Sequence, residues 1–457
     1  MPEAQKPSGF EKASTVLAPT LNTLVFIIIA RELGAESLGS VALYLSLAAC
    51  ITLSFDLGHA WGGAGGRSLR ALVHLSFTMA GFVLAAVGWL VVGCDCIIAL
   101  GLYAAYHGAT SAAIAISQDG GTSAKAGLAD GILRVAILAP LIYVFWEGGS
   151  GPLTIPIAFI FAVGGLAALA VATARYTPLS ISAARSELGE ASGGAFAFSI
   201  LAGLMMWVDK PLLYLLDGEV SLGFYFAVQR TVVFIGAAGV VIAGMVSGRF
   251  SLIDREAGKR LATLMERYAS LCVIPMGAFY IAFSRQIVAT FFGMGYAAHH
   301  ALMYPMAFAG VFTALASPSL SWLASDSKWR ALAVAAGSAL TVLVCLAVAL
   351  LESEIIEDPS TAAAVGCAIS SLALYVSVRA ILLRDGVRMH GNMPKHVACA
   401  VGMAISLHWV STSFAALGLA ELVFLALAGV LVYGLLLYLF GEFMQGEYGE
   451  FKALRGV

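Results

Sequence analysis

Two stretches of the chain, ARELGAESLGSVALYL at Ala30–Leu45 and YLLDGEVSLGFYFAV at Tyr214–Val228, contain the same Gly-x-x-Ser-Leu-Gly sequence. The two copies occupy Gly34–Gly39 and Gly218–Gly223, which are 184 positions apart in a chain of 457 residues. Each copy joins two long apolar segments. A sequence that recurs in this way between apolar segments indicates an internal structural repeat.

The composition is that of a membrane protein. Hydrophobic residues make up 60% of the chain and charged residues only 11%, whereas a soluble protein carries about 25% charged residues. The mean hydropathy is +0.91. Lipid must therefore cover much of the apolar surface. The net charge of −2 gives no indication of a nucleic-acid partner, and none is expected.

Apolar windows of about 20 residues, the length that crosses the hydrocarbon core of a bilayer, recur along the whole chain. Short connections separate them, so consecutive helices are expected to be antiparallel neighbours. The predicted fold is an all-α polytopic membrane protein with about 14 transmembrane helices. The windows are 11–30, 40–60, 71–93, 97–117, 127–146, 154–174, 194–216, 221–248, 266–284, 301–324, 329–351, 360–383, 397–417 and 422–442.

The positions of Lys and Arg predict the orientation. With the N-terminus in the cytoplasm, twenty of the 25 Lys and Arg residues fall in or beside cytoplasmic segments, as the positive-inside rule requires. Only Arg31 and Arg285 fall on the opposite side. An even number of spans places the C-terminus in the cytoplasm as well. The polar segment Met1–Phe10 is expected to be a retained cytoplasmic end rather than a signal peptide.

The repeat predicts two lobes. Its copies join spans one and two and spans seven and eight, and this even offset gives both copies the same orientation in the membrane. Two six-helix units would then be related by an axis along the membrane normal. The polar stretch Arg175–Gly194 suits a linker between them. We predict an N-terminal lobe at 1–187, a pseudo-symmetric C-terminal lobe at 188–386, and two additional helices with a cytoplasmic tail at 387–457.

Three stretches of the chain resemble bacterial polysaccharide flippases. The first resembles their opening hairpin, in which a glycine turn precedes an apolar helix that ends in Asp-Leu-Gly. The second resembles their central hairpin, with Asp-Lys before an apolar run and a Gly-x-Tyr after the turn. The third resembles a recurring Phe-Gly…Tyr segment before span ten. In order, they are ARELGAESLGSVALYLSLAACITLSFDLG (Ala30–Gly58), WVDKPLLYLLDGEVSLGFYFAVQR (Trp207–Arg230) and TFFGMGYAAHHALMYPMAFAGVFTAL (Thr290–Leu315).

This resemblance implies membership of the multidrug, oligosaccharidyl-lipid and polysaccharide exporter superfamily. Its members have two six-helix lobes around a central cavity and work by alternating access. The polysaccharide branch moves undecaprenyl-diphosphate-linked oligosaccharides from the cytoplasmic to the periplasmic leaflet of the bacterial inner membrane, for O-antigen or exopolysaccharide synthesis. A polysaccharide polymerase and other assembly proteins would then be partners. Fourteen helices suit this branch and also the lipid II flippases of the superfamily.

Three cations lie inside predicted spans, at Arg134, Lys210 and Arg230. A charge at the centre of a bilayer costs at least about 2.5–3.5 kcal/mol, so it usually faces a cavity or a partner. One interpretation is a cationic lining that binds a diphosphate or acidic sugars, for which Arg offers paired donors. The alternative is internal pairing. Asp130 precedes Arg134 at the i,i+4 spacing, whereas Asp209 adjoins Lys210 and adjacent helical residues do not face each other.

Four residues are candidates for binding a coupling proton or sodium ion, or for gating, namely Asp56, Asp130, Asp209 and His107. For Asp56 the alternative is a cap on a turn at the membrane edge. For His107 the alternative is a packed, hydrogen-bonded histidine. The sequence does not choose between a proton, a sodium ion and no coupling ion.

Aromatic residues near the second repeat are candidates for stacking on sugar rings. Such residues also gather at membrane edges because they are amphipathic, which is the alternative interpretation. They are Trp207, Tyr214, Phe224 and Tyr225.

The sequence offers no sign of an enzyme, a cofactor or a metal site. It contains no His-Glu-x-x-His, Walker or nucleophile-elbow motif. No polar segment is large enough for a soluble catalytic domain. A cation-coupled multidrug exporter and a lipid II flippase remain the nearer alternatives, and an integral-membrane acyltransferase is the remote one.

Overall fold

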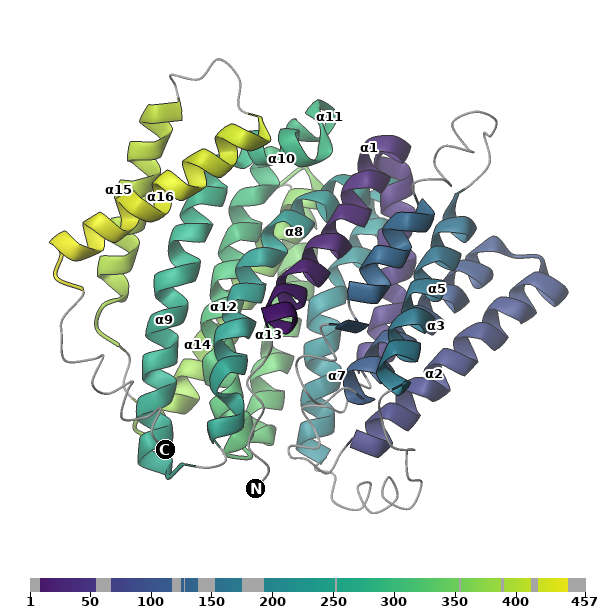
Figure 1. The fold of residues 1–457 in the computed structure, drawn as a ribbon, viewed down its shortest axis with the longest axis horizontal. Coiled ribbons are helices and arrows are strands. Elements are labelled where there is room, and N and C mark those ends of the chain that lie inside the picture. Colours follow the sequence, from purple (N-terminus) through teal and green to yellow (C-terminus); the bar gives the residue numbers. More distant parts are fainter. Residues whose placement is uncertain are drawn as a thin grey trace. The chain divides into compact units, whose positions relative to one another are not determined.

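The computed structural model describes residues 9–54, 67–116, 125–126, 128–138, 153–174, 193–250, 253–352, 355–387, 390–411 and 418–442. Nearly all of these residues are helical, and none of them lies in a strand (Figure 1). The α-helices are α1 (Gly9–Ser54), α2 (Arg67–Val87), α3 (Asp95–Ile116), α5 (Thr154–Thr173), α7 (Gly193–Trp207), α8 (Asp209–Phe250), α9 (Arg255–Ala282), α10 (Ser284–Phe292), α11 (Met294–Ala297), α12 (Met303–Ser325), α13 (Trp329–Glu352), α14 (Pro359–Arg384), α15 (Met393–Ser411) and α16 (Leu419–Leu439).

The chain is an all-α polytopic membrane protein, as its composition predicts. Wherever its residues are described, every predicted window is mostly helical, and 128–138 supplies the described part of the fifth. Within the described part of the chain, eight helical stretches are long and apolar enough to cross a membrane, or nine if the bent pair α9–α10 counts as one span. One of these stretches, Gly193–Ala243, covers two predicted spans because it continues through the break at Gly218.

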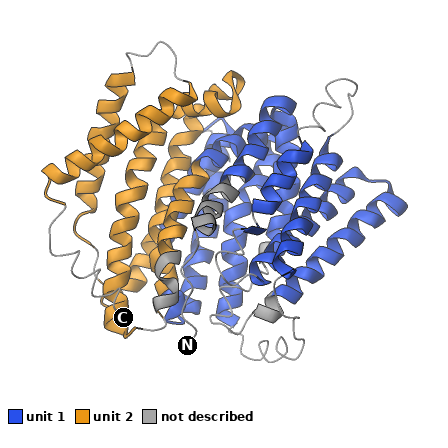
Figure 2. Ribbon diagram, viewed as in Figure 1, with its two compact units in different colours: residues 1–231, 323–374 blue, residues 232–322, 375–457 orange. Residues whose placement is uncertain are grey.

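The chain divides into two compact units, shown in Figure 2. Unit 1 contains Met1–Thr231 and Leu323–Leu374, and unit 2 contains Val232–Trp322 and Tyr375–Val457. The division cuts through α8, α12 and α14, so it does not follow the lobe boundaries expected from the repeat. Those boundaries stay a prediction, and residues 175–192 of the proposed linker at 175–194 lie outside the described residues.

The two copies of the repeated sequence have the same backbone conformation. Gly34 breaks α1 with φ 82° and ψ −178°, and Gly218 breaks α8 with φ 79° and ψ −167°. Glycine adopts a positive φ without the steric penalty that a side chain would bring. Each copy is therefore a helix–turn–helix in which the first glycine makes the turn.

The last glycines of the two copies make a reciprocal contact inside unit 1. A Cβ added to Gly39 would lie 1.8 Å from the carbonyl oxygen of Glu219, and a Cβ added to Gly223 would lie 1.9 Å from that of Ala35. Glu219 is the repeat equivalent of Ala35, and Gly223 is the equivalent of Gly39. Such an exchange of equivalent contacts is the property of a two-fold relation. The sequence repeat is thus a structural repeat at these hairpins.

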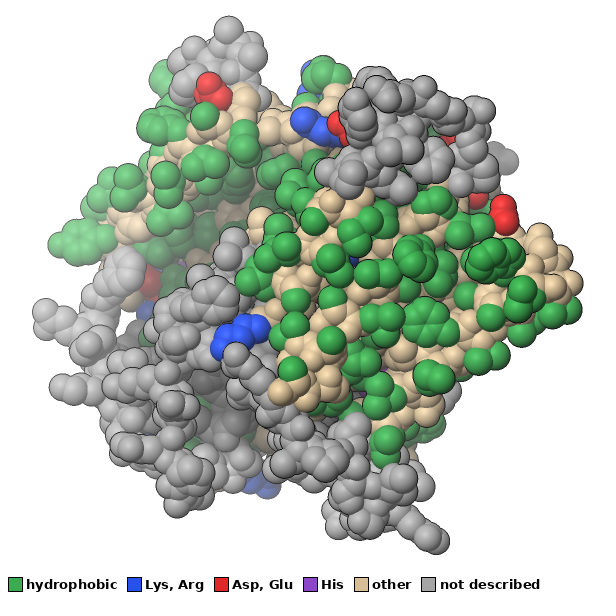
Figure 3. All heavy atoms as spheres, turned by 45° about the vertical axis from the view of Figure 1, so that its right-hand side comes forward, with side chains coloured by type: hydrophobic (Ala, Val, Ile, Leu, Met, Phe, Trp, Pro, Cys, Tyr) green, Lys and Arg blue, Asp and Glu red, His purple; other side chains and the backbone are tan. Residues whose placement is uncertain are grey.

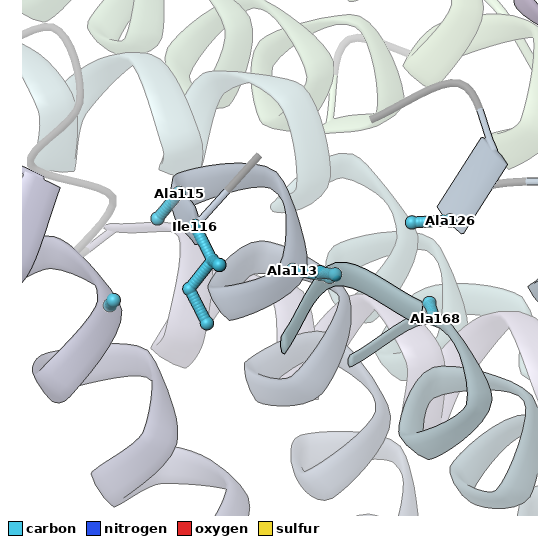
Figure 4. Packing of buried hydrophobic residues seen from close by; sticks show 7 residues of the cluster. Ala113, Ala115, Ile116, Ala126 and Ala168 are labelled. Carbon is cyan, nitrogen blue, oxygen red and sulfur yellow. The ribbon is translucent and has the colours of Figure 1, made fainter. Parts of the chain in front are cut away.

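Small residues also allow close packing of the neighbouring helices α2, α3 and α5 of unit 1. A Cβ on Gly81 would meet the backbone of Gly101 and Ala105 at 2.6 and 2.5 Å. A buried group of six alanines and one isoleucine packs together near one end of these helices (Figure 4). Its members are Ala71, Ala113, Ala115, Ile116, Ala126, Ala168 and Ala172.

Large apolar side chains are exposed in both units. In unit 1, Trp89 and Leu90 are 76% and 80% exposed, and Met79 and Val83 of α2 are also exposed. Figure 3 shows hydrophobic side chains spread over the face that it presents, with few charged ones among them. In water a patch of this extent would mark an interaction surface or an aggregation liability. In a polytopic membrane protein it is the surface that contacts lipid.

We expect Gly39→Ala and Gly223→Ala each to lower the stability of the purified protein in detergent. The added methyl would overlap a backbone carbonyl, and overpacking of this kind typically costs about 1–3 kcal/mol. Gly236→Ala is the matched control, because a Cβ there meets nothing within 4 Å and alanine favours helix. Thermal unfolding of the three variants checks this, and equal melting temperatures for G39A, G223A and G236A would contradict the reciprocal contact.

Candidate functional site

A connected group of aromatic side chains forms the interior of unit 1. Phe26 of α1 lies 5.8 Å from Phe161 of α5 and 5.2 Å from Phe226 of α8, between ring centroids. Tyr106 of α3 lies 5.2 Å from Phe161, edge to face. With Trp207, described below, these rings form what we call the aromatic cluster. It brings together residues from five helices of unit 1.

Arg134 packs on one side of the aromatic cluster and pairs with Asp130. Its Nη2 donates to the Asp130 carboxylate, and both side chains are buried. The guanidinium carbon lies 4.7 Å from the centroid of Phe161 and 5.2 Å from that of Tyr106. Gly164 makes room for this pair, because a Cβ there would lie 2.4 Å from Asp130 Oδ1. The i,i+4 pair foreseen from the sequence is therefore present.

Lys210 is also paired, although adjacent helical residues were not expected to face each other. Its Nζ donates to Asp209 Oδ1 and to the Met206 carbonyl oxygen, each at 2.8 Å, and lies 5.1 Å from the Trp207 ring. That expectation holds inside a continuous helix, whereas α7 ends at Trp207 and α8 begins at Asp209, so the pair lies at the start of a helix. Both side chains of the Asp209–Lys210 pair therefore turn to the same interior.

Arg230 differs from the other two cations. It makes no ion pair with any described residue, and its Nε has no hydrogen-bond partner among them. Its guanidinium carbon lies over three rings of the aromatic cluster, at 4.3 Å from Phe226, 4.5 Å from Phe26 and 5.7 Å from Trp207. The side chain is half-buried. Aromatic faces attract a cation but do not neutralise its charge.

The three predicted cations therefore meet on one aromatic cluster, with two carboxylates beside them. If all five groups are ionised, these described residues together carry one positive charge in excess, and Arg230 is the cation among them that has no carboxylate partner. An arginine donates paired hydrogen bonds to phosphate and carboxylate oxygens. The arrangement is suited to an anionic ligand that contacts Arg230.

The other candidates have mainly packing contacts. His107 is buried, its Nε2 lies 3.2 Å from the Leu45 carbonyl oxygen, and its ring meets that of Trp207 edge to face at 5.9 Å. This is the packed, hydrogen-bonded histidine of the alternative interpretation. Tyr225 is fully buried and donates to Asp209, so its ring has no exposed face for a sugar. Tyr214 and Phe224 are half-buried.

Two further predictions concern Asp56 and metal binding. Asp56 lies outside the described residues. Among the residues that are described, no group of three or more His, Cys, Asp and Glu side chains is arranged to hold a metal ion.

A second buried polar network, in unit 2, was not identified from the sequence. Glu442 Oε1 accepts from Arg267 Nε at 2.8 Å and from Asn392 Nδ2, and it lies 3.0 Å from His396 Nε2. Ser270 Oγ lies 2.7 Å from His396 Nδ1 and 3.3 Å from His390 Nε2. The network joins α9 to the ends of α15 and α16.

The residue beside this network, Glu266, is paired as well. Its carboxylate accepts from Arg379 Nη1 and from the Tyr375 hydroxyl, both at 2.8 Å. From the sequence, Arg267 and Arg379 were assigned only to the positive charges in or beside cytoplasmic segments. The adjacent Glu266 and Arg267 at the start of a predicted span were the one available signal of buried pairing.

Comparison with solved structures identifies the fold. The lipid II flippase MurJ in an inward closed conformation is similar at 13% identity, with a TM-score of 0.71 over 95% of this chain and 99% of that chain. An inward-facing MATE-family multidrug resistance transporter of the MOP superfamily matches at 12% identity, with a TM-score of 0.56 over 82% and 98%. A MOP-superfamily transporter from Pyrococcus furiosus with reversed polarity of its binding pocket matches at 10% identity, 0.50, over 82% and 93%.

No protein-family model matches the sequence, and a search of curated proteins finds no match. At identities this low the likeness shows the fold alone, which is similar to the folds of MurJ and of MATE-family transporters. These structural neighbours are transport proteins and not enzymes.

We expect Asp130→Asn to destabilise the protein strongly. The substitution leaves the Arg134 charge buried without its carboxylate, and breaking a buried pair on one side typically costs about 3–5 kcal/mol. The double variant D130N/R134Q should recover much of the loss, because it removes both charges. Thermal unfolding and yield in detergent measure both effects. A double variant no more stable than D130N would show that the pair does not balance charge.

The network in unit 2 should make stability depend on pH. Burial, with the nearby His396, Arg267 and Arg379, lowers the pKa of His390 from 6.5 to about 4, although Glu442 opposes the shift. The unfolded chain therefore binds this proton more readily, so stability should fall as pH decreases from about 6.5 toward 4. Melting temperatures across this range should fall less steeply for H390Q than for wild type, and parallel curves would contradict the assignment.

Proposed function

We propose that this protein is a flippase that moves undecaprenyl-diphosphate-linked oligosaccharides from the cytoplasmic to the periplasmic leaflet of the bacterial inner membrane. The observation that carries the proposal is the unbalanced positive charge of Arg230 on the aromatic cluster. A lipid-linked diphosphate supplies the opposite charge in a form that arginine binds through paired hydrogen bonds. The MOP-superfamily fold supports a mechanism by alternating access, and no catalytic role is proposed.

In this proposal the three cations have different roles. Arg230 contacts the diphosphate or acidic sugars of the substrate. Arg134 and Lys210 are each paired with a carboxylate of the chain. In the proposal they hold the aromatic cluster and the helices around Arg230 in place. Trp207 lies beside both Lys210 and Arg230, and its half-buried ring is the aromatic group best placed to meet a sugar.

Two alternatives share the fold. A lipid II flippase also moves a lipid-linked diphosphate, as the similarity to MurJ suggests, and Arg230 would serve it equally well. A multidrug exporter for cationic compounds is less compatible with the site, because an unbalanced positive charge repels a cation. An integral-membrane acyltransferase stays the remote alternative, because the sequence contains no His-Glu-x-x-His or nucleophile-elbow motif.

Deletion of the gene separates these alternatives. Loss of surface polysaccharide in viable cells supports the proposal. Accumulation of lipid II with lysis would indicate the lipid II flippase, and drug sensitivity with normal surface glycan would indicate an exporter. A polysaccharide polymerase and glycosyltransferases encoded nearby would add support for the first outcome.

We expect Arg230→Gln to reduce surface polysaccharide at least tenfold when it replaces the wild type, with unchanged amounts of protein in the membrane. Loss of a charge-assisted hydrogen bond costs about 1.5–3 kcal/mol, which corresponds to about a tenfold change or more. Arg230→Lys should retain part of the activity, since it keeps the charge but not the paired donors.

Arg285→Gln is the matched control, because Arg285 is exposed and belongs to unit 2, whereas the residues of the aromatic cluster belong to unit 1. It should leave surface polysaccharide unchanged. Normal polysaccharide in the R230Q strain would contradict the role given to Arg230, and loss of the R230Q protein from the membrane would instead assign Arg230 to structure.

A further inference from the structure

The Asp209 carboxylate is fully occupied by groups of the chain itself. Its Oδ2 accepts from the Tyr225 hydroxyl at 2.5 Å and from Gln229 Nε2 at 3.2 Å, and the Cys367 thiol lies 3.6 Å away. Its Oδ1 accepts from Lys210 Nζ at 2.8 Å. These donors come from both arms of the second hairpin and from α14, all within unit 1.

The Lys210 ammonium is surrounded by groups of the kind that bind a free cation. Two oxygens contact it, one from the Asp209 carboxylate and one from the Met206 carbonyl, each at 2.8 Å. The Trp207 ring lies 5.1 Å from the nitrogen and offers a cation–π contact. Only 2% of the Lys210 side chain is exposed. Carboxylate and carbonyl oxygens are the ligands that hard cations prefer.

The hairpin itself does not require this charge pair. In the first copy of the repeat, the equivalents of Asp209 and Lys210 are Val25 and Phe26, which are buried and apolar. That copy forms the same turn, with nearly the same φ at its glycine. Apolar residues often stabilise a buried position as well as an ion pair does. The pair at the second hairpin therefore serves something other than folding of the turn.

We propose that Lys210 is a tethered counter-ion in a monovalent-cation site formed by the Asp209 carboxylate, the Met206 carbonyl oxygen and the face of Trp207. Because the chain supplies this cation, Asp209 does not exchange a free sodium or potassium ion. Removal of the lysine side chain opens the site to such an ion. This inference holds whichever substrate the protein moves, so its failure and that of the proposed function are separate outcomes.

The test compares melting temperatures of purified protein in choline, lithium, sodium and potassium chloride at equal ionic strength. Wild type should show the same value in all four salts. Lys210→Ala should melt lower in choline chloride and recover by several degrees, saturably, in at least one alkali-metal salt. Lys210→Met is the matched control, because its unbranched side chain fills the space without charge, and it should show no recovery. D209N/K210A should lose the salt response.

Two results would overturn the proposal. One is a saturable response of the wild type to sodium or potassium that D209N abolishes, since Asp209 would then already bind a free ion. The other is a K210A protein that melts at one temperature in all four salts. If K210A cannot be purified, D209N/K210A should restore the yield by removing the unpaired carboxylate, and failure of the double variant would assign Lys210 to packing and also overturn the proposal.

Discussion

A cation buried in a membrane protein needs a counter-charge or a polar ligand, and this constraint organises the interior of unit 1. Ion pairing satisfies it for Arg134 and Lys210, through Asp130 and Asp209. For Arg230, which is half-buried, the described residues provide only the faces of Phe26, Phe226 and Trp207, and such faces attract a cation by about 0.5–2 kcal/mol. This is less than the lowest estimates of the cost of placing a charge in the bilayer, about 2.5–3.5 kcal/mol, and an anionic ligand would add the missing counter-charge.

The scaffold that holds these charges is built from a repeat, but the charges are not repeated. Gly34 and Gly218 make equivalent turns, and Gly39 and Gly223 exchange equivalent contacts. On either side of these shared glycines, the second hairpin has Asp209, Lys210 and Arg230 where the first has Val25, Phe26 and Ser46. Phe26 then packs against Arg230 itself. Each hairpin thus contributes a different part of the site, which explains why a duplicated fold carries an unbalanced charge.

Local chemistry was predictable from the sequence, and distant pairing was not. Each turn requires a positive φ at one residue, which glycine adopts without a steric penalty, so the turns could be predicted from the glycines. The Asp130–Arg134 pair follows from i,i+4 spacing. The Asp209–Lys210 pair was one of two interpretations from the sequence, and the rule against pairing of adjacent residues assumes a continuous helix, which the chain interrupts at Val208. The network of Arg267 with Glu442 joins residues 175 positions apart, so no local pattern indicates it. Tyr225 illustrates the same limit, because its aromatic type suggested sugar stacking while its hydroxyl binds a carboxylate.

Among the described residues of the site, Arg230 is the cation without a carboxylate partner, and we propose that it binds the anionic part of the substrate. Native mass spectrometry of the purified protein with undecaprenyl diphosphate measures this directly. We expect saturable binding of the lipid to wild type and binding at least about tenfold weaker to R230Q. Equal affinity of the two proteins for the lipid would contradict it.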